Sequence, residues 1–420
     1  MQLYSTKTPT LRTTLKEAIF QGMPADNGLY MPVHIPSMSG DWINQLAEFS
    51  FQEIAFEIAQ SLIGAEIPAN DLRNIIESSV NFPPPLTPLE AESSFILELF
   101  HGPSLAFKDF GARFMAKTMA YFNESGDKDL IILVATSGDT GGAVAAGFHR
   151  TPGIQVVILY PSGKVSPLQE KQLTALGHNV QALEIAGTFD DCQALVKQAF
   201  LDTQLRNTLR LSSANSINIA RLIPQIFYYW EAYKQVQHLG KRVNFIVPSG
   251  NFGNLTATNI NDIVPEYLQT GIFSPRPSEP TLSNAMDVGN PSNFARILAL
   301  YGSTWNIIKE HLSGYAFTDE ETESAMRQVY TRHRYTLDPH GAVGYLAWKA
   351  YHTEFHDEDS LGIILETAHP AKFLEDVERI LNQKISIPAT LSELRGKTKQ
   401  STLLSVDYAN LKKFLLESFI

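Results

Sequence analysis

The chain has 420 residues, and 44% of them are hydrophobic, which is enough to fill more than one core. Glycine and proline contribute 26 and 23 residues, so collagen-like and disordered classes are excluded. A net charge of −11 argues against a nucleic-acid-binding protein, because contact with the phosphate backbone requires a basic face.

The first part of the chain, residues 1–85, is predicted to form an N-terminal domain. Helical patterns run over residues 15–21 and 51–62. The segment N-F-P-P-P-L-T-P-L, residues 81–89, then brings four prolines in nine residues. Proline fixes its own φ angle and keeps the preceding residue out of the helical region, so we place a domain boundary here.

From about residue 95, short apolar runs rich in β-branched residues alternate with longer helical segments. Continuous apolar runs are typical of parallel strands buried on both faces, and their alternation with helices predicts βαβ units. The runs are residues 94–100, 129–136, 155–160, 179–185, 243–248 and 361–367. The predicted fold class is therefore α/β, with doubly wound, largely parallel sheets and ligands at the carboxyl ends of the strands.

The segment H-G-P-S-L-A-F-K-D-F, residues 101–110, follows the first of these strands. Phenylalanines recur at spacings of three and four from Phe107 onward, which predicts a helix with Ser104 as its N-cap. Lys108 would lie in the first turn, where the helix dipole and desolvation lower its pKa toward the range that Schiff-base chemistry needs. The alternative is an ordinary solvated lysine paired with Asp109.

Two glycine-bearing loops follow later strands. S-G-D-T-G-G-A, residues 137–143, offers hydroxyls and a helix start, which suit a carboxylate or a phosphate. S-G-N-F-G-N, residues 249–254, offers backbone N–H groups and the amides of Asn251 and Asn254, which suit a phosphate, and residues 255–259 can continue as a helix. Neither loop matches a Walker A or dinucleotide-binding motif. For each, a simple turn is the alternative, with Ser137 or Asp139 as the cap in the first.

The last predicted strand ends in T-A-H-P-A-K-F, residues 367–373. The hydroxyl of Thr367 either faces the cleft or caps the following helix. A reactive lysine, two anion-binding loops and a neutral hydroxyl together match a cofactor with an aldehyde, a phosphate and a ring nitrogen. Pyridoxal phosphate is such a cofactor.

These segments resemble those of the threonine synthase family, whose members have the tryptophan-synthase-β fold type, and the resemblance runs end to end. D-N-G-L-Y-M-P, residues 26–32, and D-P-H-G-A-V-G, residues 338–344, resemble further segments of that family. Two positions depart from its pattern. Asn27 replaces a usual glycine, and Gly341, next to His340, stands where the family often has threonine.

The resemblance implies a fold of two lobes with the cofactor between them. The large lobe that binds pyridoxal phosphate is expected to contain residues 86–109 and 216–420. The small, substrate-binding α/β lobe is expected to contain residues 110–215.

The resemblance also implies roles for individual residues. Lys108 would form the Schiff base with pyridoxal phosphate, and Thr367 would face the pyridine nitrogen. The residues expected to hold the cofactor phosphate are Gly250, Asn251, Phe252, Gly253 and Asn254. The residues expected to hold the substrate α-carboxylate are Ser137, Gly138, Asp139 and Thr140. The substrate phosphate would be bound by Asn215 and Arg221 of N-S-I-N-I-A-R, with Lys164 as a weaker candidate.

The implied activity is a β,γ-replacement that converts O-phospho-L-homoserine and water to L-threonine and phosphate. Lys108 would act as the base at the α-carbon. A lyase that releases 2-oxobutyrate from the same substrate is one alternative, and a non-catalytic pyridoxal-phosphate-binding protein is another. The expected partner is the small-molecule substrate, without nucleic acid or membrane, and a monomer and a homodimer both remain open.

The remaining sequence features say less about function. Cys192 is the only cysteine, which excludes an internal disulfide, and its acidic neighbours disfavour a thiolate nucleophile. His352 and His356 are spaced for one helix face, but a solvated surface explains them better than a metal site does. The N-terminus lacks a signal-peptide pattern and no apolar run reaches the length of a membrane span, so we expect a cytoplasmic location.

Overall fold

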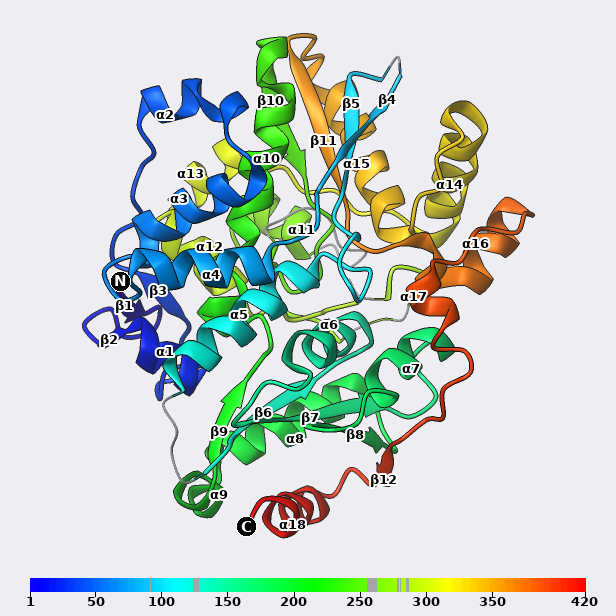
Figure 1. Cartoon of the computed structure of the whole chain (residues 1–420). Coiled ribbons are helices and arrows are strands. Elements are labelled where there is room, and N and C mark those ends of the chain that lie inside the picture. Colours follow the sequence, from blue (N-terminus) through cyan, green and yellow to red (C-terminus); the bar gives the residue numbers. More distant parts are fainter. Residues whose placement is uncertain (91, 124–127, 255–262, 278, 280, 285–286) are drawn as a thin grey trace.

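The computed structural model describes residues 1–420 except 91, 124–127, 255–262, 278, 280 and 285–286. Within these residues the strands form sheets of three, four and five strands. Figure 1 shows the four-stranded sheet in the upper half of the molecule and the five-stranded sheet in the lower half, with α5 (Lys108–Phe122) and α6 (Asp139–Phe148) between them. The predicted α/β architecture of two lobes is confirmed.

The N-terminal part combines a small antiparallel sheet, in the order β2-β1-β3, with helices. Both predicted helices form, and each begins with a capping box: Thr14 with Glu17, and Ser50 with Glu53. The elements are β1 (Gln2–Ser5), β2 (Arg12–Thr14), α1 (Leu15–Gln21), β3 (Tyr30–Pro32), α2 (Gly40–Asn44), η1 (Leu46–Glu48), α3 (Phe51–Ile63) and α4 (Ala69–Ser79).

The large lobe is built on the sheet β10-β11-β5-β4. Its first three strands are parallel, and β4 pairs antiparallel with β5 at the edge. The second half of the proline-rich segment forms β4, which is tolerated because an edge strand need not donate every N–H. The strands are β4 (Leu86–Leu89), β5 (Ser94–Glu98), β10 (Arg242–Ile246) and β11 (Ser360–Glu366). The helices are α10 (Gln225–Val236), η3 (Gln237–Leu239), α11 (Ile263–Thr270), α12 (Phe294–Leu300), α13 (Trp305–His311), α14 (Asp319–His333), α15 (Pro339–Phe355), η5 (Pro370–Phe373), α16 (Leu374–Leu381) and α17 (Ala389–Ser392).

The small lobe is built on a fully parallel sheet in the order β12-β8-β7-β6-β9. All six residues of β6 are buried. Alternate residues of β6 belong to two different hydrophobic clusters, so helices cover both faces of the sheet as the apolar run predicts. The strands are β6 (Leu130–Ala135), β7 (Ile154–Pro161), β8 (Val180–Ile185), β9 (Arg210–Ser213) and β12 (Thr402–Leu404). The helices besides α5 and α6 are α7 (Pro167–Thr174), α8 (Phe189–Leu201), α9 (Thr203–Thr208), η2 (Ile219–Arg221) and α18 (Tyr408–Phe419).

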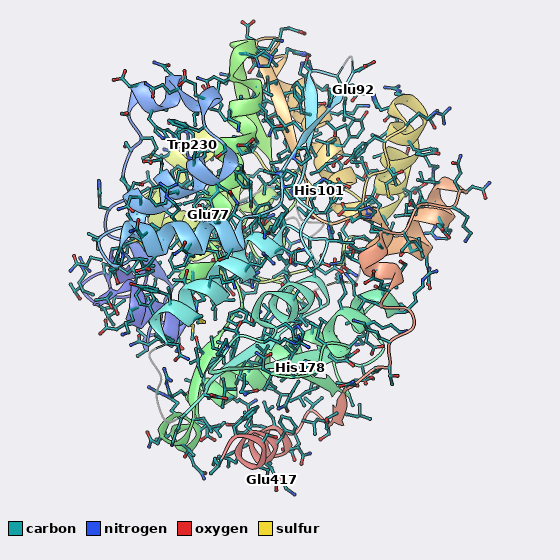
Figure 2. All side chains as sticks on the ribbon, viewed as in Figure 1. Glu77, Glu92, His101, His178, Trp230 and Glu417 are labelled. Atoms are coloured by element: carbon teal, nitrogen blue, oxygen red, sulfur yellow. The ribbon has the colours of Figure 1, made fainter. Side chains whose placement is uncertain are left out.

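The end of the chain returns to the small lobe. The sequence predicts residues 216–420 in the large lobe, and for this last segment the prediction is wrong. Strand β12 adds to the edge of β8, and Leu411 and Leu415 of α18 pack in the cluster that contains Cys192 of α8. Figure 2 shows Glu417 at the lower end of the molecule and Glu92 at the upper end.

All six predicted strands are present, within two residues at each end. The strands that the sequence did not predict are short, and β9 has the sequence R-L-S-S, with a single apolar residue. Among the described residues, no helix is long and apolar enough to cross a membrane.

Candidate active site

Lys108 begins helix α5 at the junction of the two lobes. The loop after β5 runs antiparallel to the segment after β11, with Phe107 N–H donating to Thr367 C=O (2.8 Å) and His369 N–H donating to Leu105 C=O (3.0 Å). His101, on this loop, lies near the centre of the molecule (Figure 2). The two strand ends are thus joined directly, which fixes Lys108 beside Thr367.

The surroundings of Lys108 favour the uncharged amine. Burial lowers the pKa of Lys108 to about 8; the cations Lys372 and Arg221 lower it as well, while Asp139 opposes them. The predicted pKa shift by desolvation is therefore confirmed. The prediction that Ser104 caps the helix is wrong, because the N-cap is Phe107 and no side chain caps it.

The loop after β6 forms a tight turn into α6. Gly138 has a φ of +144°, and the hydroxyl of Thr136 accepts hydrogen bonds from the N–H groups of Gly138 and Gly141, each at 2.9 Å. Thr136 therefore caps this turn, instead of Ser137 or Asp139. Within the described residues, the half-buried hydroxyls of Ser137 and Thr140 make no hydrogen bond, so both are available to a ligand.

The carboxylate of Asp139 is not available to a ligand in the same way. It lies 2.5 Å from Lys372 Nζ, and both side chains are almost fully buried. Gln169 donates to the same oxygen at 2.9 Å. Although burial opposes ionisation, Lys372 and Lys108 hold the pKa of Asp139 well below its usual range. The loop thus has hydroxyl groups available to a ligand, while its own negative charge is neutralised.

The loop of residues 249–254, after β10, is folded by its own side chains. Ser249 donates to Asn254 Oδ1 (2.7 Å), and Asn254 Nδ2 donates to Pro248 C=O (2.9 Å). Asn251 Nδ2 donates to Ser216 Oγ (2.9 Å). Each amide nitrogen carries two N–H groups, so one donor of each side chain remains, and the expectation that these amides bind a phosphate stays a prediction.

The backbone of this loop fits a phosphate. Phe252 has a φ of +54°, which turns the chain sharply. Among the described residues, none of the backbone N–H groups of residues 250–254 has a hydrogen-bond acceptor. Unpaired, converging N–H groups at a strand's carboxyl end are what an anion-binding nest requires. The helix expected over residues 255–259 lies outside the described residues.

Thr367 follows β11 and is part of a buried polar network. Its hydroxyl lies 3.0 Å from His340 Nδ1, which is also 3.4 Å from Asp338 Oδ2. Asp338 in turn accepts from the N–H groups of Gly341 (2.6 Å) and Ala368 (3.0 Å). A neutral hydroxyl held by His340, at the start of α15, fits a ring nitrogen of the cofactor.

Glu366 belongs to the same buried polar network. It is fully buried, its Oε1 accepts from Asp338 N–H (2.5 Å), and burial and the nearby Asp338 carboxylate raise its pKa well above the usual value. A Cβ at Gly341 would lie only 1.6 Å from Glu366 Oε2. Glycine at this departure from the family pattern therefore makes room for the carboxyl group.

We expect Gly341→Ala to lower the free energy of unfolding by about 1–3 kcal/mol, the usual cost of an overpacked site. Helix propensity alone favours alanine, so the steric conflict with Glu366 determines the sign. Urea denaturation measures the effect. Gly40→Ala is the control, since a Cβ there has no neighbour within 4 Å. Equal stability of Gly341→Ala and the unchanged chain would mean that Glu366 moves away without loss.

Arg221 lies at the end of η2 and is 3% exposed. Its Nη1 donates to Ala214 C=O (2.5 Å), while its buried Nε has no partner among the described residues. Burial lowers its pKa to about 10, which leaves it charged at neutral pH. Asn215 donates to Ala135 C=O (2.9 Å), which ties this segment to the end of β6, directly before the loop of residues 137–140.

Not every predicted residue joins this group. Lys164 is exposed and its charge acts on Asp191, at the start of α8. Burial raises the pKa of Cys192 to about 12, which agrees with its exclusion as a nucleophile. No group of three or more potential metal ligands exists among the described residues, His352 and His356 included.

Three residues were missed at this site. Lys372 carries the charge that neutralises Asp139; Asn293 donates to Ser216 Oγ (3.0 Å) and to Asn251 C=O (2.9 Å); and Tyr229 donates to Asn254 C=O. Lys372 lies inside T-A-H-P-A-K-F, so its place in that segment was the available signal. Asn293 and Tyr229 have no local signal, because each acts on a segment distant in sequence.

Comparison with known proteins identifies the family of this chain. Residues 80–366 match the family of pyridoxal-phosphate dependent enzymes, residues 2–80 match the threonine synthase N terminus, and residues 341–415 match the threonine synthase C-terminal family. Threonine synthase of Haemophilus influenzae is 43% identical over 100% of both chains, and that of Escherichia coli is 42% identical over 99% of both.

Solved structures agree. The crystal structure of threonine synthase from Escherichia coli has a TM-score of 0.92 at 41% identity and covers 99% of this chain and 100% of its own. A threonine synthase from Brucella melitensis with bound pyridoxal phosphate has a TM-score of 0.88 at 31% identity and covers 99% of both chains. With matches over its whole length, this chain belongs to the threonine synthase family of pyridoxal-phosphate-dependent enzymes.

Proposed function

We propose that this chain is a threonine synthase that converts O-phospho-L-homoserine and water to L-threonine and phosphate. The observation that carries this proposal is that Lys108, Thr367 and the unpaired backbone N–H groups of residues 250–254 follow the carboxyl ends of three neighbouring parallel strands, β5, β11 and β10. These groups match the aldehyde, the ring nitrogen and the phosphate of pyridoxal phosphate, respectively.

The chain's residues divide the work at this site. Lys108, Thr367 and the loop of residues 250–254 would hold pyridoxal phosphate, which when bound supplies an electron sink for a carbanion at the substrate α-carbon. The hydroxyls of Ser137 and Thr140 would bind the substrate carboxylate. Arg221 would bind the substrate phosphate with its charged guanidinium group, and Asn215 would hold the neighbouring loop.

Proton transfer falls to Lys108. Its pKa, lowered to about 8, raises the fraction of free amine near neutral pH far above that of an ordinary lysine, and the free amine can remove the proton from the α-carbon. The β-carbon then loses a proton and phosphate leaves the γ-carbon; the γ-carbon is protonated, water adds at the β-carbon and the α-carbon regains a proton. These steps require that the substrate be held at both ends. Ser137 and Arg221 lie on separate segments and would bind the two ends of the substrate, its carboxylate and its phosphate.

One incubation tests the proposal. The purified chain is mixed with pyridoxal phosphate and O-phospho-L-homoserine, and phosphate, threonine and 2-oxobutyrate are measured together. We expect phosphate and threonine in equal amounts. Formation of phosphate and 2-oxobutyrate would show that the chain is a lyase instead of a synthase. Absorbance of bound cofactor without release of phosphate would show that O-phospho-L-homoserine is not the substrate.

A further inference from the structure

Two opposite charges are buried together at the junction of the lobes. Asp139 comes from the first turn of α6 in the small lobe, and Lys372 comes from η5 in the large lobe. Their charged atoms are 2.5 Å apart, with side-chain exposures of 2% and 0%. Lys372 also donates to Ser104 C=O at 3.0 Å, on the loop that leads to Lys108.

Stability alone does not explain such a pair. Desolvating two charges costs about as much as their attraction returns, so apolar residues of similar size are often equally stable in such a place. The pair instead coincides with functional neighbours. Asp139 lies within the loop proposed to bind the substrate carboxylate, and its charge and that of Lys372 both act on Lys108.

The charged groups that face Lys108 come from three elements. Asp139 on α6 favours the protonated lysine, whereas Lys372 on η5 and Arg221 on η2 favour the free amine. His340 of α15 adds a further interaction with Asp139. Lys372 therefore has two effects of the same sign, because it repels a proton on Lys108 and also cancels much of the attraction from Asp139.

We propose that Lys372 is a positioning residue that neutralises Asp139, joins the carboxylate-binding loop to the large lobe and keeps Lys108 in its reactive form. This inference rests on the proposed role of Lys108 as the cofactor lysine. An uncompensated Asp139 would repel a substrate carboxylate at the same loop, so its neutralisation serves substrate binding as well.

The test measures how fast the full-length chain, stripped of cofactor, forms its visible Schiff-base absorbance with pyridoxal phosphate at a series of pH values. Only the free amine reacts, so the midpoint of the profile follows Lys108. We expect Lys372→Met to raise the midpoint by about one pH unit or more, since an opposite charge nearby shifts a pKa by about 1–3 units. Asp139→Asn leaves Lys372 unopposed and is expected to lower the midpoint.

Two further variants separate charge from damage to the fold. The double variant Asp139→Asn, Lys372→Met removes both charges and is expected to return the midpoint toward that of the unchanged chain. Lys413→Met removes an exposed lysine of α18 and is expected to have no effect. Because the two single variants are expected to shift in opposite directions, general loss of structure cannot imitate the result.

The outcomes also distinguish this inference from the proposed function. If the unchanged chain forms no absorbance that depends on Lys108, the proposed function fails. If it does, but the midpoint of folded Lys372→Met is unchanged, the role of Lys372 is overturned. A midpoint that moves upward in Asp139→Asn would overturn it too, and this measurement remains decisive where Lys372→Met fails to fold.

Discussion

Replacing Lys108 by alanine is expected to abolish the visible absorbance of bound pyridoxal phosphate and to lower the rate of threonine formation by at least about 10³-fold. The variant loses both the amine that attaches the cofactor and the base at the α-carbon, and proton transfer alone contributes about 10²–10⁴-fold. Absorbance spectra and product assays measure the two losses separately.

The fold of this variant should remain, because Lys108 is at the start of α5 and the core residues of the helix are unchanged. Lys117→Ala is the matched control, since it removes an exposed lysine from the same helix. We expect that control to keep both absorbance and activity. Full activity in Lys108→Ala would end the assignment of this residue and of the mechanism built on it.

Replacing Arg221 by alanine is expected to weaken binding of O-phospho-L-homoserine while leaving cofactor binding nearly unchanged. A hydrogen bond to a charged group contributes about 1.5–3 kcal/mol, so KM is expected to rise by about 10- to 150-fold. Arg221 is suited to this role because it is charged and buried, and its Nε has no partner among the described residues. Steady-state kinetics and titration with pyridoxal phosphate measure the two affinities.

Arg221 also donates to Ala214 C=O, so thermal unfolding of the variant accompanies the kinetics. Arg206→Ala, at an exposed position of α9, is the control and is expected to change neither affinity. Equal loss of substrate and cofactor affinity in Arg221→Ala would assign the arginine to the cofactor phosphate instead.

The sequence predicts the central sheets well because their strands carry a strong local signal. Strands such as β6 and β11 are continuous apolar runs, and burial on both faces leaves few other structures for them. Strands β9 and β12 are only four and three residues long, so pairing with a neighbouring strand, and not a local pattern, makes them strands. Their positions are set by tertiary contact, which a single sequence does not display.

The candidate site also has parts that the sequence predicts and parts that it does not. Loops at strand ends are predictable, because glycine and hydroxyl residues mark the turns there and ligands bind at the carboxyl ends of parallel strands. The residues that contact those loops cannot be predicted, because they are distant in sequence. Asp139 and Lys372, for example, form an ion pair although they are more than two hundred positions apart. The side chains of Asn251 and Asn254, which were expected to contact a ligand, also shape the loop, and no sequence pattern indicated this second role.

The return of the chain's end to the small lobe has a consequence for its synthesis. Until residues 402–404 leave the ribosome, β8 is an edge strand with unpaired N–H and C=O groups, and the cluster beneath α18 is uncovered. The small lobe, although its other strands are made early, is therefore completed last. During translation the small lobe exposes a sheet edge to other nascent chains. A chain that ends before β12 should therefore aggregate more readily than a chain from which N-terminal residues have been removed.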